Sequence, residues 1–520
     1  MTTGRPGVYV SERLLPAPIT STASANAAGA CIGEFAQGPS EVTLVRSWYD
    51  FTNTFGGYNL AYPATIGVGE FFKNGGSELY VRRVLGTGAG KAAVDITDGT
   101  SPVCTVTAKE KGSAGTNLRV STQKSRSTGT GGSTVYYYTL TVTREVGGLA
   151  GIADDVVLEQ FTNVRFDSAN SSDDVLQVTS SSKYITVSAV DRAKKPATTG
   201  AITTFALAGS GLDGLRASAA NYTAVLDDFL YIERPLVLFA PEILNIVLYT
   251  HAAGEGGSPP AITGDGVTVQ TALVSWAEQH DGFAVIDTPD GKTVDEALAH
   301  AASMGASSHA AVYYPNVYIS DPLGRGASSI RLVGPAGAVA GLYLATDALR
   351  GPFKAPAGLN AGIGTAVATE RKFTADQLDT LNSSQTPVNA IRNIPGSGVV
   401  VMGARTLLQD GTSNRYVSMR RSLIYIKKQL EQITQFAIFE TNDERLWANL
   451  RTAVSVFLNE YRNQGGLRGT IPADAYYVKC DKENNVDSDI AQGIVNIEVG
   501  VALEYPAEFV AINLTQKTVS

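Results

Sequence analysis

The chain has 520 residues, 44% of them hydrophobic, and its 41 basic and 49 acidic residues give a formal net charge of -8. This length exceeds what one core usually holds, so we expect several domains. The net negative charge excludes a basic surface over the whole chain of the kind that nucleic-acid-binding proteins have. The apolar run at 337–345 is too short to span a bilayer.

The first predicted element is a short strand formed by Val8, Tyr9 and Val10, which lies between Pro6-Gly7 and the proline-containing segment 16–18. No neighbouring run could pair with this strand as a hairpin, and proline donates no ladder hydrogen bond. We therefore predict that residues 1–24 are an N-terminal arm and linker, whose strand is added to the sheet of another chain.

From residue 25 onward, apolar strands alternate with helices. The predicted strands are 28–36, 41–45, 78–84, 235–241, 283–288 and 310–319, and the predicted helices include 47–55, 222–231, 269–280, 295–304 and 336–350. Near-continuous apolar strands separated by amphipathic helices are typical of a parallel sheet covered on both faces. The pattern predicts a discontinuous α/β middle domain made of residues 25–90 and 205–370.

Between these two halves the pattern changes to alternating β runs joined by polar turns rich in Gly, Ser and Thr, such as 125–134. Runs of this kind predict an all-β insertion domain at residues 91–204. The three cysteines, Cys31, Cys104 and Cys480, are far apart and in no metal-ligand spacing, so we expect them to be reduced and buried.

Residues 371–506 have a third pattern, which predicts an α+β C-terminal domain. A capping box that begins at Thr441 predicts a helix with an apolar face from Leu446 to Tyr461. The run 493–505 alternates strictly and predicts a long strand of a receiving sheet, with these residues on one side: Val495, Ile497, Val499, Val501 and Leu503.

The last segment, residues 507–520, follows Pro506 and predicts a C-terminal donated strand. Its candidate linking residues are Phe509, Val510, Ala511, Ile512, Asn513 and Leu514. Two unpaired strand edges would be a liability in a monomer, and they favour pairing with other chains by strand addition.

The sequence indicates no catalytic, cofactor or metal site. The glycine-rich run 85–93 has Leu85 where a phosphate loop needs glycine and Ala92 where it needs Ser or Thr. The acidic run 481–492 lacks the glycine and the final glutamate of a calcium loop. A hydrolase-like triad of Asp287, a serine and one of four histidines is the remote enzymatic alternative; the histidines are His251, His280, His300 and His309.

A basic stretch near the start of the C-terminal domain contains Arg405, Arg415, Arg420, Arg421, Lys427 and Lys428. One interpretation is a solvated helix with salt bridges, and another is a surface that faces an acidic protein partner. Nucleic-acid binding is a third interpretation, but such a surface would interleave more aromatic residues on one face.

Several stretches resemble, in order along the chain, the tail sheath proteins of contractile phage tails and related contractile injection systems. These stretches are PGVYVSE (6–12), KGSAGTNLRV (111–120), LAGSGLDG (207–214), AGAVAGLYLATDALRGPFKAPAG (336–358), GARTLLQD (403–410), Arg420-Arg421, FETND (439–443) and GTIPADAYYVKCDKENN (469–485). Thr441 stands where the family often has proline, and the turn at 209–214 is longer than usual.

The resemblance implies a multi-domain sheath fold. The α/β middle domain would have a subtilisin-like outline without catalytic use, the β insertion would lie outermost, and the C-terminal domain would face an inner tube. The basic residues expected to face that tube are Arg420, Arg421, Lys427 and Lys428. The N-terminal and C-terminal arms would add strands to neighbouring subunits.

The implied function is structural. Subunits would form hexameric rings stacked in a helical polymer around an inner tail tube protein, with baseplate and tail terminator proteins as further partners. Contraction would drive the tube through a cell envelope. The expected location is the contractile tail of a virion, assembled in the host bacterial cytoplasm, and the alternative is the sheath of a bacterial injection system. We expect no nucleic-acid partner and no membrane contact.

Overall fold

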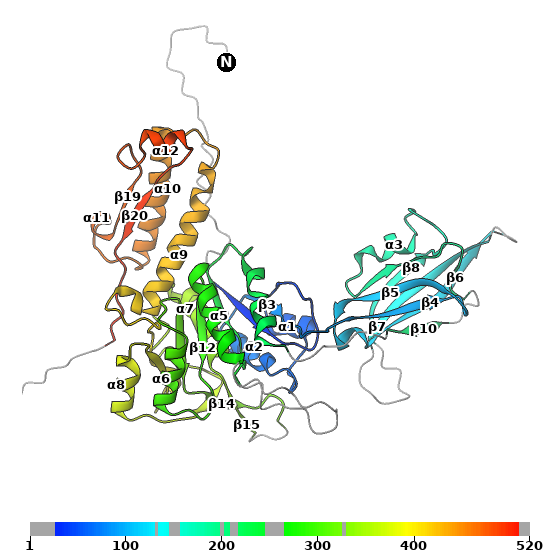
Figure 1. The fold of residues 1–520 in the computed structure, drawn as a ribbon, viewed down its shortest axis with the longest axis horizontal. Coiled ribbons are helices and arrows are strands. Elements are labelled where there is room, and N and C mark those ends of the chain that lie inside the picture. The colour runs from blue at the N-terminus through cyan, green and yellow to red at the C-terminus, as the bar shows by residue number, and fades with distance from the viewer. Residues whose placement is uncertain are drawn as a thin grey trace, which may run out of the picture.

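The computed structural model contains three bodies: a central α/β body, a C-terminal body packed directly against it, and a β insertion set apart from both (Figure 1). The predicted arm strand at residues 8–10 and the predicted donated strand at residues 509–514 lie outside the described residues. The structure describes residues 27–129, 134–144, 156–197, 202–207, 217–244, 265–324 and 329–508.

An eight-stranded sheet forms the centre of the central body. In spatial order its strands are β18 (Gly398–Val401), β17 (Val388–Ile394), β13 (Ala310–Tyr314), β12 (Phe283–Asp287), β11 (Leu236–Phe239), β1 (Ala28–Gly33), β3 (Leu79–Arg83) and β2 (Thr43–Val45). The pairings from β17 through to β3 are all parallel, and only the two edge strands, β18 and β2, pair antiparallel. The predicted parallel sheet is therefore confirmed.

Helices cover both faces of this sheet because its strands are apolar on both sides. Cys31 packs into the cluster on one face, whereas Ala30 and Ile32 pack into the cluster on the other. The first face is covered by α1 (Trp48–Phe55), α2 (Ala64–Lys73) and α7 (Ala336–Arg350), and the second by α4 (Ala219–Thr223), α5 (Asp265–Gln279), α6 (Val294–Ser303) and α8 (Ala375–Ser383).

Helices α2 and α7 approach each other closely, and a glycine makes this possible. A Cβ atom added at Gly337 would lie 2.1 Å from the main-chain oxygen of Gly67. Any side chain at position 337 would therefore push the two helices apart.

Three predictions for this body were wrong in detail. The run 310–319 is two strands, because Pro315 has no N–H to continue the ladder; the second strand, β14 (Val317–Ser320), joins a small sheet with β15 (Ile330–Val333) and β16 (Ala366–Thr369). The helix predicted at 222–231 is the short α4 followed by a 3₁₀ turn at Leu226–Phe229. The boundary at 370 is misplaced, because β17 and β18 belong to the central sheet.

The β insertion has two small sheets and a core of its own. One sheet contains β4 (Lys91–Thr97), β5 (Pro102–Lys111) and β9 (Ile185–Ser188); the other contains β10 (Thr203–Ala206), β6 (Leu118–Thr128), β7 (Val135–Arg144) and β8 (Val156–Val164), and a short helix, α3 (Val175–Val178), follows β8. The buried Arg83 fixes the junction with the central body, because its guanidinium donates to the main-chain oxygens of Phe35, Gly38 and Lys111 at 2.9, 3.0 and 3.0 Å.

The C-terminal body consists of two long helices and a two-stranded sheet. Its elements are α9 (Val417–Thr434), α10 (Glu444–Asn463), α11 (Pro472–Ala475), β19 (Tyr476–Lys479), α12 (Asp487–Ala491) and β20 (Glu498–Val501). The N-cap of α10 is Asp443, whose carboxylate accepts the Leu446 N–H at 2.9 Å. The capping box predicted from Thr441 was therefore wrong, because the helix begins two residues later and its third residue, Leu446, has no side-chain acceptor to return the bond.

Across the described parts of the chain, no helix combines the length and the apolar character that a bilayer span requires. The three cysteines are buried and unpaired, as expected from their spacing. The predicted class of mixed α/β structure with several sheets is confirmed.

Candidate assembly interface

The two-stranded sheet of the C-terminal body has one face buried against helices and one face in solvent. Tyr476 lies opposite Val501, and Val478 lies opposite Val499, in the antiparallel ladder of β19 and β20. These four side chains pack against the cluster that α9 and α10 share, and the Tyr476 hydroxyl donates to the Ser455 main-chain oxygen of α10 at 3.1 Å. The helices thus hold β20 from one side only.

The outer edge of β20 is open. The Ala502 N–H donates to the Ala475 main-chain oxygen at 2.8 Å, so this main-chain group is directed toward β19, while the Ala502 oxygen accepts the Arg468 N–H at 2.7 Å. Because neighbouring residues of a strand direct these groups to opposite edges, the N–H and C=O groups of Val499 and Val501 point away from β19. Within the described residues, no third strand pairs with that edge. It can accept an added strand.

The outer edge of β19 is partly closed. The N–H of Tyr476, the first residue of β19, donates to the Pro472 main-chain oxygen at the start of α11. This bond uses the donor that a strand added beside β19 would need first. The two edges of the sheet are therefore not equivalent, and the free ladder groups lie on the β20 side.

The strand predicted over 493–505 is much shorter, because side chains take the place of a partner strand before residue 498. The Asn496 N–H donates to Asn485 Oδ1 at 2.6 Å, and the Asn496 oxygen accepts from the Asn484 and Asn485 side-chain amides at 3.1 Å each. The predicted alternation still holds, since Val495 and Ile497 pack against the cluster that contains Leu446 and Trp447.

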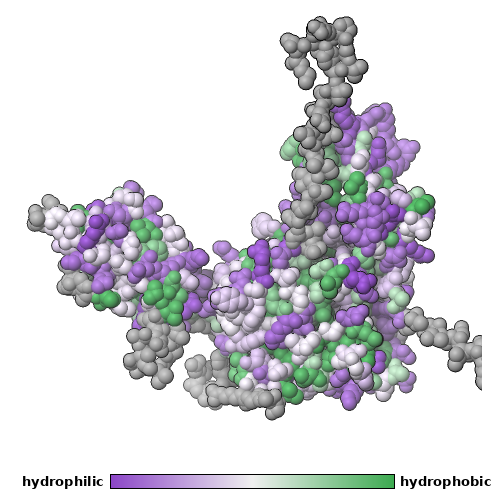
Figure 2. Space-filling view, turned by 180° about the vertical axis from the view of Figure 1, so that it is seen from behind, coloured by the Kyte–Doolittle hydropathy of each residue, from purple (hydrophilic) through white to green (hydrophobic). Residues whose placement is uncertain are grey.

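The solvent face of the sheet is covered by an aromatic ring. The Tyr477 hydroxyl donates to Glu498 Oε1 at 2.7 Å, and a Cβ atom at Gly500 would lie 2.1 Å from the Tyr477 ring. The ring thus lies across the glycine and shields the adjacent main chain from water. From behind, the C-terminal body is mostly hydrophilic, and apolar residues gather mainly over the lower part of the central body (Figure 2).

The basic residues of α9 do not form one exposed surface. Arg421 is buried and forms an ion pair with Asp347, so the prediction that Arg421 faces a tube was wrong, because its guanidinium is directed into the interior. Lys427 Nζ lies 2.5 Å from Asp281 Oδ2. The placement of Lys427 toward a partner stays a prediction.

The other two basic residues are both partly buried. Lys428 Nζ lies 3.2 Å from Glu431 Oε2 on the same helix. Arg420 is half-buried, and burial lowers the pKa of its guanidinium. Their contact with a tube also stays a prediction.

The candidate triad does not assemble among the described residues. His300 Nε2 lies 3.1 Å from the main-chain oxygen of Asp287, whereas the Asp287 carboxylate accepts the Ala336 N–H at 2.6 Å at the start of α7. Burial, and then the charge of Glu242, raise the pKa of Asp287 well above its ordinary value. This carboxyl group therefore caps a helix.

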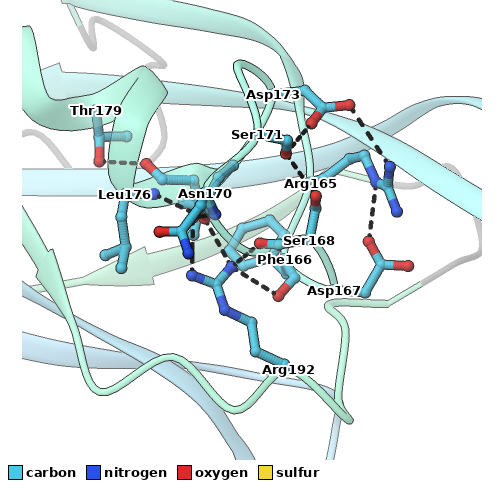
Figure 3. Close-up of polar contacts among 12 residues, drawn as sticks. Arg165, Phe166, Asp167, Ser168, Asn170, Ser171, Asp173, Leu176, Thr179 and Arg192 are labelled. Carbon is cyan, nitrogen blue, oxygen red and sulfur yellow. Dashed lines mark hydrogen bonds and ion pairs between the residues drawn. The ribbon is translucent and has the colours of Figure 1, made fainter.

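An acidic loop in the β insertion is closed by arginines (Figure 3). Asp174 receives two hydrogen bonds from Arg192, at 2.6 and 3.0 Å, and Arg165 lies 3.0 Å from Asp167 and 3.7 Å from Asp173. The two guanidinium groups thus pair with the carboxylates of this loop. In the described parts of the chain, no group of three or more His, Cys, Asp or Glu residues could hold a metal ion.

One pair of residues at this interface was missed by the sequence reasoning. Arg405 was grouped with the solvated basic residues, but its guanidinium is nearly buried and binds Glu508, the last described residue. A possible signal was the position of Arg405 between Gly403 and an apolar run, which is unusual for a solvated arginine.

Two family models match the chain one after the other. The model described as phage tail sheath protein central domain matches residues 250–407, and the model described as phage tail sheath C-terminal domain matches residues 409–517. Together they cover just over half of the chain. The tail sheath protein of Vibrio phage KVP40 is 26% identical over 187 residues, which are 35% of this chain and 26% of that protein. The match thus spans about a quarter of the length of that curated relative.

Solved sheath structures share the fold over nearly the whole chain. The sheath of the extracellular contractile injection system PVC, in its contracted state, has a TM-score of 0.56 at 20% identity and covers 99% of both chains. A sheath tail protein from Listeria innocua has a TM-score of 0.60 at 14% identity and covers 92% of this chain and 96% of that one. At these identities the similarity establishes the fold alone.

Proposed function

Because the chain belongs to the phage tail sheath family, we propose that it is the structural subunit of a contractile sheath. Copies stack as hexameric rings around an inner tube, and the polymer shortens to drive the tube through a cell envelope. The observation that carries the proposal is the ordered match of both sheath domain models along one chain. The chain is then a non-enzymatic component of a tail.

The open edge of β20 supports a specific link between subunits. In our proposal, an arm from a neighbouring subunit adds a strand beside Val499 and Val501. Each main-chain hydrogen bond of such a strand contributes about 0.5–1.5 kcal/mol net. One arm therefore gives a subunit only modest affinity for its neighbour, but the many arms of a polymer together hold it firmly. The candidate arms are the segments 8–10 and 509–514, whose apolar residues suit a half-buried strand.

The three bodies would have different places in the polymer. The C-terminal body would face the inner tube, the central body, with its subtilisin-like outline, would surround it, and the β insertion would lie outermost. The separation of the β insertion from the other two bodies in Figure 1 supports this order. Baseplate and tail terminator proteins would bind the two ends, and assembly would take place in the bacterial cytoplasm.

A second candidate has an observation in its favour. The similarity to the PVC sheath favours a contractile injection system as much as a phage tail. The two functions share the polymer and the contraction and differ in the machine that carries them. The content of purified particles distinguishes them, because a phage tail is attached to a DNA-filled head.

The test of the proposed function is electron microscopy of the purified subunit. We expect hollow striated tubes or rings. Deleting residues 1–12 or residues 509–520 should leave a folded subunit that forms no long tubes, since each deletion removes one donated strand. Tubes of normal length from both truncated chains would contradict the linking arms.

A single substitution tests the receiving edge. Val501→Pro removes the N–H that points to the open edge and leaves the ladder to β19 intact, as proline can at an edge strand. We expect a folded subunit that assembles poorly. Val501→Thr keeps both the N–H and the branched shape, so it is the matched control and should assemble as the unmodified chain does.

A further inference from the structure

The last described residue is held on its own subunit by a two-point ion pair. Arg405 Nε lies 3.2 Å from Glu508 Oε1, and Arg405 Nη2 lies 2.6 Å from Glu508 Oε2. The side chains are 8% and 20% exposed, so water screens the pair weakly. Paired bonds of this kind fix the direction of both side chains.

Arg405 is in turn fixed to the central sheet. Its main-chain N–H donates to Asn389 Oδ1 at 2.7 Å, and Asn389 Nδ2 donates to the Arg405 main-chain oxygen at 2.8 Å. The same amide group donates to the Val312 oxygen at 3.1 Å, so Asn389 connects Arg405 to both β17 and β13. Asn389 is buried and Arg405 Nη1 also donates to the Asn382 oxygen at 2.8 Å, which leaves the guanidinium little freedom.

The segment before Glu508 has fewer polar contacts, although the Tyr505 ring lies edge-on to Tyr416 with 6.3 Å between the ring centroids. Residues 504–508 form one wall of a groove of about 500 Å³, which is also lined by parts of α8 and β17 and by the segments 353–358 and 402–404. From Tyr505 to Ala507 the structure gives no hydrogen bond to any other described residue. Glu508 is therefore the point where the segment is fixed again, immediately before residues 509–514.

We propose that Arg405 is a positioning residue for the C-terminal arm. By binding Glu508 it sets the place and the direction in which residues 509–520 leave the subunit, and it transmits a pull on the arm through Asn389 into the central sheet. The inference rests on the proposed function, because it assigns a role to an arm that binds a neighbouring subunit. Fixing the root of the arm reduces the ordering that strand addition requires.

The first test uses the isolated subunit and does not depend on assembly. Spin labels are placed on cysteines introduced as Val510→Cys and Ala375→Cys, and the distribution of distances between them is measured. We expect a narrow distribution in the otherwise unchanged chain and a clearly broader one with Glu508→Gln. Glu504→Gln is the matched control, because Glu504 is exposed, lies on the same segment and has no ion pair among the described residues.

The second test measures assembly. Glu508→Gln should raise the protein concentration at which tubes appear roughly tenfold, because strand addition must then also order the root of the arm. Arg405→Lys keeps the charge but not the two-point geometry, so it should give an intermediate value. Glu504→Gln should leave the onset unchanged.

The outcomes separate the two proposals. If the unmodified chain forms no tubes, the proposed function fails, and the label distances still test the placement of the arm. If tubes form but Glu508→Gln changes neither the label distances nor the onset of assembly, the positioning role of Arg405 is wrong. If Glu504→Gln weakened assembly as much as Glu508→Gln, the positioning role of Arg405 would also be wrong, because the effect would then come from the net charge of the segment.

Discussion

Arg421 of α9 and Asp347 of α7 form a buried ion pair that joins the C-terminal body to the central body. Their side chains are 4% and 3% exposed, and Arg421 Nη1 lies 3.0 Å from Asp347 Oδ1 while a second contact joins Nη2 to Oδ2. The guanidinium also lies 4.5 Å from the centre of the Tyr343 ring. This pair connects the body that carries β20 to the parallel sheet.

The first prediction concerns the loss of one partner of this pair. Arg421→Ala should lower the free energy of unfolding by about 3–5 kcal/mol, because the buried Asp347 carboxyl group would lose its partner in the interior. Urea unfolding of the subunit measures this change. Lys427→Ala, which breaks the exposed pair with Asp281, is the control and should cost at most about 1 kcal/mol. If both variants lowered the free energy of unfolding by the same amount, burial would not be what makes the Arg421–Asp347 pair important.

The second prediction concerns acid and the β insertion. Burial tends to raise the pKa of Asp174, but its bonds from Arg192 and from the Leu176 and Asn170 N–H groups lower it overall. At pH values above the ordinary aspartate pKa, the ion pair therefore stabilises the folded insertion. This stabilisation is lost as the pH falls through the lowered pKa that Asp174 has in the folded state.

Amide exchange of β6 and β7 at decreasing pH measures this loss. Arg192→Met should lower the stability of the insertion already at neutral pH. In this variant the further loss of stability on acidification should be smaller than in the unmodified chain. An exchange pattern in β6 and β7 that is the same in both chains at every pH would show that the pair does not support the insertion.

The third prediction has the opposite sign. The pKa of Asp287 is raised well above its ordinary value, mainly by burial and then by the charge of Glu242, while the Ala336 N–H opposes the shift. The charged form is thus disfavoured in the folded state, and stability falls as the pH rises from the ordinary aspartate pKa toward the raised one. Asp287→Asn keeps an acceptor for the Ala336 N–H and should flatten this pH dependence of the urea midpoint. If the urea midpoint of Asp287→Asn changed with pH as steeply as that of the unmodified chain, Asp287 would not be the group responsible.

The fourth prediction concerns the contact between α2 and α7. Gly337→Ala places a Cβ atom 2.1 Å from the Gly67 oxygen, and it should cost roughly 1–3 kcal/mol because main-chain atoms must move. Gly364→Ala is the control, since nothing lies within 4 Å of a Cβ atom there. Thermal unfolding compares the two, and a lower melting temperature for the control than for Gly337→Ala would refute the close approach.

The sequence predicted the central sheet well because its strands are continuous apolar runs. All residues of β12 and the first nine residues of α7 are buried, and these residues are apolar or small in almost every case. The division of the run 310–319 was harder to predict, since both halves are apolar and only Pro315 separates them.

The interface was less predictable because its key contacts join residues far apart in the sequence. The alternation of β20 indicated which side chains face inward, yet the Asn484 and Asn485 side chains that end its ladder are polar residues of an ordinary-looking turn. Likewise, nothing near Arg421 indicates that its partner is Asp347, 74 residues earlier. The local sequence pattern predicts which side chains are buried, whereas the partner of each side chain depends on the completed fold.

Hydrogen exchange at two amides tests the central claim most directly. The account predicts that Val499 and Val501 exchange rapidly in the isolated subunit, where their N–H groups face the open edge of β20, and slowly in assembled tubes, where an added strand binds them. Gly500, which faces β19, should be protected in both states. Equally rapid exchange of Val499 and Val501 in tubes and in subunits would contradict the linkage of copies through this edge.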